Sequence, residues 1–278
     1  MAKKLLLTSG CSYTDKNYES CDPAVNVDWA MWPELLANHL GLACVNYARS
    51  GVGCDTICDS IIEGIETYKD RVDTVAILWS GSDRLPLFSH TLNPLVEIRY
   101  RDDDGPDPFS WLTDIGWGRL SKIYFNSPHF LRDRVYKDMI HAQLRKMSTI
   151  IKLCKYHDIK LVMAQGLWFF DYHAINQAVK EKAVRALCAV DFKEVFNNMT
   201  NNPYFEHLEN NKKHLIGWPF YANLGGYYFD ELRFDNKVPA DYYTISEIDK
   251  HPNAIGQKMF AEEFINRYDL LYSVRRSD

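Results

Sequence analysis

The hydrophobic pattern of the chain is dominated by short, mostly apolar segments that each end in small or polar residues. Four of them stand out, at residues 5–7, 43–47, 74–79 and 160–164. Segments of this length that are apolar at successive positions are typical of strands buried on both faces of a parallel sheet. The pattern therefore predicts a set of core strands spread along the chain.

Between these segments, apolar residues recur every three or four positions, which is the spacing of an amphipathic helix. A clear example is the series Ile57, Ile61 and Ile65, with Asp55 or Thr56 expected near the N-cap. Helices are predicted at about 32–40, 55–68, 135–157, 173–188 and 253–272. Strands that alternate with helices in this way indicate an α/β protein with a mostly parallel sheet.

Two long stretches, at about 85–134 and 191–246, lose this regularity and are rich in aromatic residues. Their rings either form a small core for an insertion or line a cleft that stacks on sugars, and the first reading is favoured. With 278 residues and 46% hydrophobic content, the chain can bury one substantial core. We expect a single domain, 1–278, that carries both stretches as insertions.

The composition argues against several classes of partner. A formal net charge of −5 provides no basic surface for nucleic acid. No apolar run approaches the ~20 residues of a membrane span, and the three leucines near the N-terminus are too few for a signal peptide. The seven cysteines are scattered and form no Cys-x-x-Cys pair, so we interpret them as free thiols and expect a reducing, cytoplasmic location.

Neither a metal nor an organic cofactor is expected. His39, His141 and His157 lack the spacing of metal ligands relative to one another. Gly51 and Gly53 follow the second strand like the start of a dinucleotide-binding loop, but the third glycine of that fingerprint is absent. A tight turn from strand to helix is the simpler interpretation.

A candidate nucleophile follows the first strand. Gly10 permits a sharp turn at the carboxyl end of that strand, the edge at which open α/β sheets bind their ligands. Ser12 would lie at this edge, and a hydroxyl there can act as a nucleophile if a base reaches it. Cys11 is its neighbour and a rival nucleophile, but adjacent residues in a turn point in different directions. Taken alone, the pattern is more often that of an ordinary turn.

A candidate acid–base pair lies near the other end of the chain. Asp249 and His251 directly precede the last predicted helix. A carboxylate and an imidazole on one loop can work together, since the carboxylate fixes the tautomer of the imidazole that takes a proton from serine. The chain order is then Ser, Asp, His.

The chain resembles the SGNH (GDSL) hydrolase family in four blocks that occur in the family's order. Gly10-Cys11-Ser12-Tyr13-Thr14 resembles the first block, Gly-Asp-Ser-Leu, and 46–53 resembles the second, with Gly51 as its glycine. Ser80-Gly81-Ser82-Asp83 lies where Gly-x-Asn-Asp belongs, and Asp249-Lys250-His251-Pro252 resembles the last block, Asp-x-x-His-Pro. The resemblance spans residues 10 to 252 and is more specific at its two ends than in the middle.

The resemblance implies a fold and a site. The fold would be a three-layer α/β/α sandwich of flavodoxin-like type, with a mostly parallel sheet of about five strands. The activity would be hydrolysis of ester bonds without a cofactor, with Ser12 as nucleophile, His251 as general base and Asp249 as its orienting carboxylate. Small-molecule or glycan esters would be the substrates. Backbone N–H groups of Ser12 and Gly51, together with the Ser82 side chain, would hold the oxyanion.

Three departures from the family pattern leave alternatives open. Cys11 replaces an Asp, the spacing from Asp249 to His251 is one residue shorter than the commonest form, and Ser82 replaces the Asn that donates to the oxyanion. Asp83, next to Arg84, is either part of the substrate site or half of an ion pair. An acyltransferase that uses the same residues is one alternative function. A catalytically weak binding or structural protein is another, and the Ser82 replacement favours it.

Overall fold

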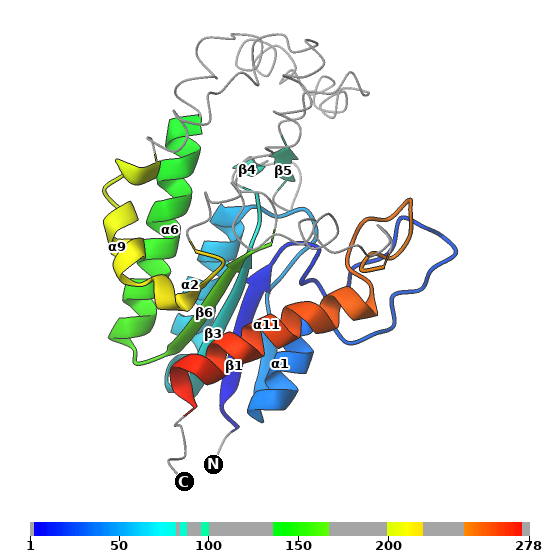
Figure 1. Cartoon of the computed structure of the whole chain (residues 1–278), viewed down its shortest axis with the longest axis horizontal. Coiled ribbons are helices and arrows are strands. Elements are labelled where there is room, and N and C mark those ends of the chain that lie inside the picture. The colour runs from blue at the N-terminus through cyan, green and yellow to red at the C-terminus, as the bar shows by residue number, and fades with distance from the viewer. Residues whose placement is uncertain are drawn as a thin grey trace.

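The computed structural model describes residues 3–81, 84–87, 96–99, 136–166, 199–218 and 242–273 (Figure 1). Its centre is a five-stranded parallel sheet in the order β2-β1-β3-β6-β7. The strands are β1 (Leu5–Gly10), β2 (Ala43–Asn46), β3 (Val72–Trp79), β6 (Lys160–Gln165) and β7 (Leu215–Ile216). The expected α/β architecture with a parallel sheet of about five strands is confirmed.

The strands form where the apolar segments predicted them because both of their faces are covered. Along β3, the residues from Thr74 to Trp79 are all buried, and successive side chains point to opposite faces of the sheet. Val75 and Ile77 belong to one core cluster, whereas Ala76 and Leu78 belong to the other. A strand between two helical layers needs apolar residues at every position, which explains the absence of alternation in the sequence.

In the part of the chain that the structure describes, helices cover both faces of the sheet (Figure 1). On one face, α1 (Trp32–Leu40) and α11 (Ala254–Tyr272) contact each other, and α11 packs on β6. On the other face, α2 (Cys54–Tyr68) packs on β1 and β3 and contacts α6 (Tyr136–Tyr156). The ring of Trp32 in α1 stacks on Phe264 in α11, with centroids 4.3 Å apart, and both side chains are fully buried. This stack fixes the last helix of the chain against the first.

In the described residues, the helix boundaries lie close to the predicted ones. Pro33 occupies the first turn of α1, where a missing N–H costs nothing. The N-cap of α2 is Gly53, a residue type that is favoured at this position, and the helix begins at Cys54. Asp55 lies in the first turn, near the cap as expected.

Parts of the two aromatic-rich stretches have regular structure. In the first, β4 (Arg84–Leu87) pairs antiparallel with β5 (Val96–Arg99). In the second, α9 (Phe205–Asn210) packs on α6, and a short 3-10 helix (Lys212–His214) leads into β7. A further 3-10 turn (Lys69–Arg71) precedes β3. The helix predicted at 173–188 lies outside the described residues, as do most of the aromatic residues on which the cleft alternative depended.

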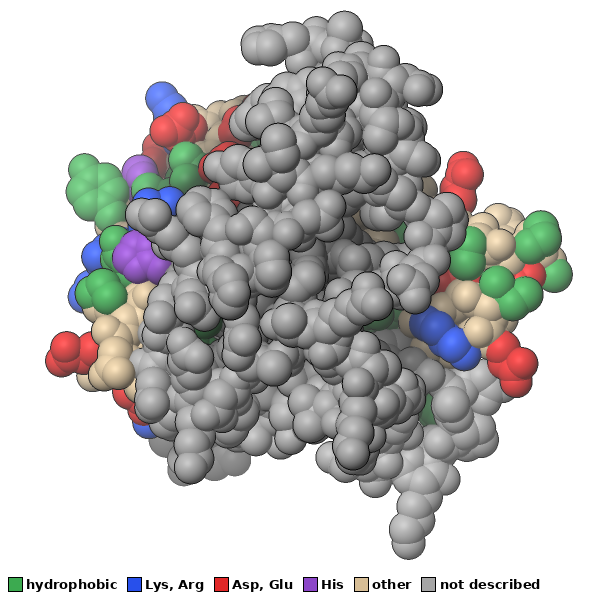
Figure 2. Space-filling view, turned by 90° about the horizontal axis from the view of Figure 1, so that it is seen from above, with side chains coloured by type: hydrophobic (Ala, Val, Ile, Leu, Met, Phe, Trp, Pro, Cys, Tyr) green, Lys and Arg blue, Asp and Glu red, His purple; other side chains and the backbone are tan. Residues whose placement is uncertain are grey.

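The surface of the described part mixes residue types. Figure 2 shows charged side chains of both signs interspersed with apolar ones along the described edges of this face. Within the described residues, every helix is too short or too polar to cross a lipid bilayer. In the same residues, His, Cys, Asp and Glu side chains nowhere gather in groups of three or more that could hold a metal ion.

Candidate active site

Ser12 lies in a tight turn at the carboxyl end of β1. The amides of Thr14 and Asp15 both donate to the carbonyl of Cys11, at 2.9 and 3.1 Å, so the chain makes one helical turn directly after the strand. Gly10 is needed at the start of this turn, because a Cβ there would lie 2.2 Å from Oγ1 of Thr14. The turn leaves Ser12 only 5% exposed.

Cys11 and Ser12 have different surroundings. Cys11 is fully buried in the core cluster that includes Trp32 and Phe260. Ser12 instead contacts His251. Of these two neighbouring nucleophiles, the hydroxyl is thus the one beside an imidazole.

Asp249 and His251 lie in a closely bonded loop that precedes α11. The amide of Ile245 donates to the carbonyl of His251 at 2.9 Å, and the amide of Asn253 donates to Tyr243 at 3.0 Å. The Asn253 side chain caps α11 by accepting from the amides of Ile255 and Gly256. Since α11 packs on the sheet, this cap brings the loop to the same edge as Ser12.

One side chain joins α11 to the turn after β1. Nε2 of Gln257 donates to the carbonyl of Tyr13 at 3.1 Å, and Oε1 of Gln257 accepts from the amide of Trp32 at 2.9 Å. Gln257 is fully buried, so leaving either group unpaired would be costly. This bridge links the segments that carry Ser12 and His251.

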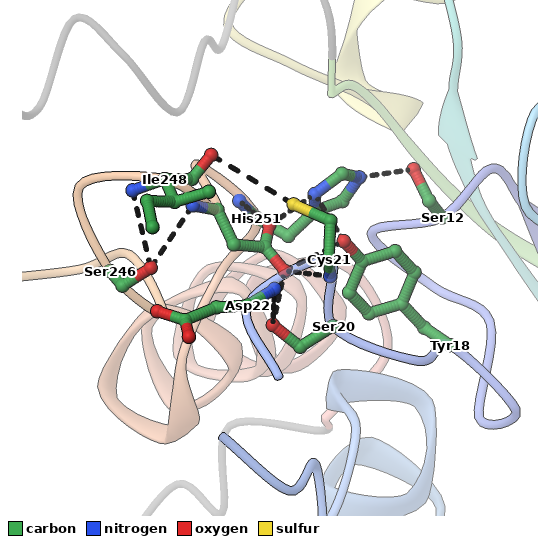
Figure 3. A network of polar contacts seen from close by, with 9 residues as sticks. Ser12, Tyr18, Ser20, Cys21, Asp22, Ser246, Ile248 and His251 are labelled. Atoms are coloured by element: carbon green, nitrogen blue, oxygen red, sulfur yellow. Dashed lines mark hydrogen bonds and ion pairs between the residues drawn. The ribbon is translucent and has the colours of Figure 1, made fainter. Parts of the chain in front are cut away.

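Ser12, His251 and Asp249 form a continuous chain of hydrogen bonds (Figure 3). Oγ of Ser12 is 2.9 Å from Nε2 of His251, and Nδ1 of His251 is 2.7 Å from Oδ1 of Asp249. The Asp249 side chain is fully buried, whereas the imidazole is 28% exposed. The three residues predicted from the two ends of the sequence are brought together at one edge of the sheet. An arrangement of this kind can pass a proton from serine to imidazole.

Several donors surround the Asp249 carboxylate. Its Oδ2 accepts from the Tyr18 hydroxyl at 2.8 Å, from Oγ of Ser20 at 2.7 Å and from the amide of Cys21 at 3.2 Å. Its Oδ1 accepts from the amide of His251 at 3.0 Å. Burial alone would raise the pKa of Asp249, but the hydrogen bonds from Ser20, His251 and Tyr18 outweigh it and lower the pKa to about 2. Asp249 is therefore an anion at any ordinary pH.

Two tyrosine rings enclose the imidazole of His251. The Tyr18 ring stacks on it, with centroids 4.1 Å apart and an interplanar angle of 30°. The Tyr13 ring meets it edge-on at 5.4 Å. Burial and the hydrogen bond to Asp249 raise the pKa of Tyr18 above its usual value, so the phenol keeps its proton.

Gly51 lies in a neighbouring loop that is tied to the turn after β1. It has a φ of +86°, a backbone conformation that glycine adopts readily. The residue before it, Ser50, donates to the carboxylate of Asp15 through both its amide and its hydroxyl. Gly51 therefore lies in a constrained loop beside the turn that holds Ser12. Ser82 and Asp83, the other predicted members of the substrate site, lie outside the described residues.

Several residues that build this site could not be identified from the sequence. Tyr18 and Ser20 lie in the irregular loop after β1, where neither periodicity nor spacing distinguishes them from other polar residues. They reach Asp249 across 231 and 229 positions of sequence. Unlike Ser12 and His251, these two residues lie in no recognisable motif, so the structure is needed to reveal their contacts with Asp249.

No protein-family model matches the chain, and no curated protein sequence matches it. Solved structures do align with it. The psychrotrophic esterase EstA from Pseudoalteromonas sp. is 11% identical, covers 98% of this chain and 100% of its own, and has a TM-score of 0.47. A G-D-S-L family protein from Desulfitobacterium hafniense, described as lipolytic, is 9% identical, covers 95% of this chain and 99% of its own, and has a TM-score of 0.44.

An acetyl xylan esterase from Geobacillus stearothermophilus is 13% identical, covers 95% of this chain and 94% of its own, and has a TM-score of 0.43. At these identities and scores, the similarity to solved structures says nothing about activity. The geometry around Ser12 and His251 must decide the function.

Proposed function

We propose that the protein is a serine hydrolase that cleaves ester bonds through Ser12, His251 and Asp249. The observation that carries this proposal is the unbroken chain of contacts from Oγ of Ser12 through both imidazole nitrogens to the buried Asp249 carboxylate. Ser12 is separated from His251 by 239 positions of sequence, so the fold brings the hydroxyl to a histidine–aspartate pair at the other end of the chain. A nucleophile beside a base that is itself oriented by a third group is the pattern of activated serine.

The proposed reaction has two halves, the acylation of Ser12 and the hydrolysis of the acyl-serine. Oγ of Ser12 attacks the acyl carbonyl while Nε2 of His251 takes the hydroxyl proton, and that proton then passes to the departing alcohol. The resulting acyl-serine is attacked by water, whose proton goes to Nε2 and returns to Oγ as the acid leaves. Asp249 stays ionised throughout and stabilises the imidazolium.

The oxyanion of each tetrahedral intermediate needs hydrogen-bond donors. We assign this role to the backbone N–H groups of Ser12 and Gly51 and to the Ser82 hydroxyl, and we assign Asp83 to the substrate site. The block resemblance supports Gly51 and Ser82, and the hydrogen bonds between Asp15 and Ser50 support a fixed position for the Gly51 loop. The reaction requires no metal and no organic cofactor.

Small O-acyl groups on carbohydrate are the substrates we would test first. The basis is the number of aromatic residues in the two insertions, at 85–134 and 191–246, since aromatic rings stack on sugar faces. Acetylated and longer-chain p-nitrophenyl esters, compared with acetylated oligosaccharides, would separate the contribution of the acyl group from that of the alcohol.

Labelling with a fluorophosphonate tests the nucleophile directly. The wild-type protein should form one covalent adduct, and peptide mapping should place it on Ser12. Ser12→Ala should abolish labelling and Cys11→Ala should retain it. An adduct that persists in Ser12→Ala would disprove the assignment.

Two alternatives differ in what they predict. An acyltransferase would pass the acyl group from Ser12 to an added sugar hydroxyl faster than to water, which product analysis would detect. A binding protein without activity would give equal rates for wild type and Ser12→Ala on every ester. The replacement of the family's Asn by Ser82 is the observation that favours the second alternative.

A further inference from the structure

Tyr18 makes an unusual pair of contacts at the back of the imidazole. Its hydroxyl lies 2.8 Å from Oδ2 of Asp249 and 2.7 Å from Nδ1 of His251. Oδ2 also accepts hydrogen bonds from Ser20 and from the Cys21 amide. Within the described residues, these two donors make no hydrogen bond to the imidazole side chain. The phenol thus contacts both members of the acid–base pair at once (Figure 3).

The protons in this cluster can be placed by counting donors and acceptors. Asp249 is ionised and can only accept, so the single proton of the Tyr18 hydroxyl is directed to Oδ2. The phenolic oxygen then presents a lone pair to Nδ1 of His251. At 2.7 Å this contact is attractive only if Nδ1 carries a hydrogen, and the same holds for the contact between Nδ1 and Oδ1 of Asp249. Both contacts therefore select the tautomer with its proton on Nδ1.

That tautomer is the one that catalysis needs. With the proton on Nδ1, Nε2 is unprotonated and can accept from the Ser12 hydroxyl, 2.9 Å away. When Nε2 gains a proton, the positive imidazolium remains bonded to two oxygens at Nδ1. The Tyr18 ring also stacks on the imidazole, which limits rotation of the ring about its side-chain bonds.

We propose that Tyr18 is a positioning residue of the active site, whose hydroxyl bridges Asp249 and Nδ1 of His251 and holds the imidazole in its catalytic tautomer. This inference rests on the proposed serine hydrolase function. It adds a fourth residue, Tyr18, to the proposed arrangement of Ser12, His251 and Asp249.

Tyr18→Phe is the decisive variant because it removes the hydroxyl and retains the stacked ring. Ser20→Ala is the matched control, since it also removes one donor to Oδ2 but leaves the contact at Nδ1 intact. Loss of a hydrogen bond to a charged group in the transition state lowers kcat by about 10- to 100-fold. We expect a decrease of this size in kcat for Tyr18→Phe, with little change in KM. Ser20→Ala should lower kcat less than Tyr18→Phe does and should leave the proton of His251 on Nδ1, because it removes only a donor to Oδ2.

A second measurement does not depend on activity. Long-range ¹⁵N–¹H correlation spectra of the imidazole nitrogens should show the proton of His251 on Nδ1 in the wild type. In Tyr18→Phe the share of this tautomer should fall, because the contact with Asp249 is then the one that selects it. A Tyr18→Phe variant with wild-type kcat and an unchanged tautomer would overturn the proposal, as would a Ser20→Ala variant that loses as much activity. If wild type and Ser12→Ala are equally inactive while the tautomer still shifts in Tyr18→Phe, the hydrolase function fails and the bridging role of Tyr18 stands.

Discussion

The carboxylate of Asp15 accepts two hydrogen bonds from one residue, Ser50. Oδ2 lies 2.7 Å from the amide nitrogen of Ser50 and 2.8 Å from its hydroxyl. Oδ1 accepts from the amide of Asn17 at 2.9 Å, and Asp15 is only 7% exposed. This carboxylate joins the turn that holds Ser12 to the loop that holds Gly51, and so links two parts of the candidate site.

Replacing Asp15 should affect both stability and turnover. Asp15→Asn leaves a single acceptor oxygen, so at least one donor of Ser50 or Asn17 loses its partner. Because Ser50 and Asn17 are exposed, the lost hydrogen bond should cost about 0.5–1.5 kcal/mol, which urea unfolding would measure. Turnover of a p-nitrophenyl ester should fall as well, because Gly51 is no longer held in place.

Asp22→Asn provides a control in the same loop, where the carboxylate accepts from the amide of Ala24 at 3.0 Å. It should change turnover little. Wild-type turnover in a destabilised Asp15→Asn protein would show that the Asp15–Ser50 contact serves the fold alone.

Two glycines with similar backbone conformations make it possible to separate an effect on stability from an effect on turnover. Gly51 has φ +86° and Gly41, at the end of α1, has φ +67°, and a Cβ added at either meets nothing within 4 Å. Alanine in this left-handed region costs about 1–2 kcal/mol, so Gly51→Ala and Gly41→Ala should lower the free energy of unfolding to a similar extent. Only Gly51→Ala should also lower kcat, since a shift of its backbone moves the proposed oxyanion donor. Equal turnover in the two variants would argue against a role for Gly51.

The low pKa of Asp249 predicts a particular dependence of stability on pH. Its pKa is about 2 in the folded protein against an ordinary value of 3.8, so the folded state binds fewer protons than the unfolded state between these values. The stabilisation is fully present above about pH 4 and is lost as the pH falls toward 2. Urea unfolding should show the advantage of wild type over Asp249→Asn shrinking across this window. If the difference in the free energy of unfolding between the two proteins stayed constant across this pH range, Asp249 would not have the lowered pKa described above.

The proposed role of Ser82 as an oxyanion donor, which comes from the resemblance of 80–83 to the SGNH block Gly-x-Asn-Asp, predicts the behaviour of two substitutions. Loss of a single oxyanion donor typically lowers turnover by about 10²–10³-fold. Ser82→Ala should therefore reduce kcat, while Ser82→Asn should preserve or raise it because the longer amide reaches further. Equal rates for wild type and Ser82→Ala, both well above the rate of Ser12→Ala, would refute the role of Ser82. The assignment of Ser12 as the nucleophile would be unaffected.

Much of the fold could be predicted from the sequence because its signals are local. The strands around Leu6, Ile77 and Val162 are continuous apolar segments, and α1, α2 and α11 have apolar residues at helical spacing. Other elements lack such signals. β7 has only two residues, Leu215–Ile216, and is a strand because β6 offers it a free edge. Its apolar pair is indistinguishable in sequence from any other.

The residues of the candidate site likewise include some that could be predicted from the sequence and some that could not. Ser12, Asp249 and His251 could be predicted because each lies in a short motif beside a predicted strand or helix. Tyr18, Ser20, Asp15 and Gln257 could not, because their roles arise from contacts with residues 35 to 244 positions away. Contacts of this range are set by how the elements pack.

The central claim is that Ser12 is the nucleophile, and the most direct test is the turnover of p-nitrophenyl acetate by matched variants. Ser12→Ala should lose at least about 10³-fold in kcat, because it removes the hydroxyl that contacts Nε2 of His251. Cys11→Ala should keep most of the activity and lose no more stability than Cys58→Ala, a second buried thiol in the core. Turnover that survives in Ser12→Ala and collapses only in Cys11→Ala would contradict the account.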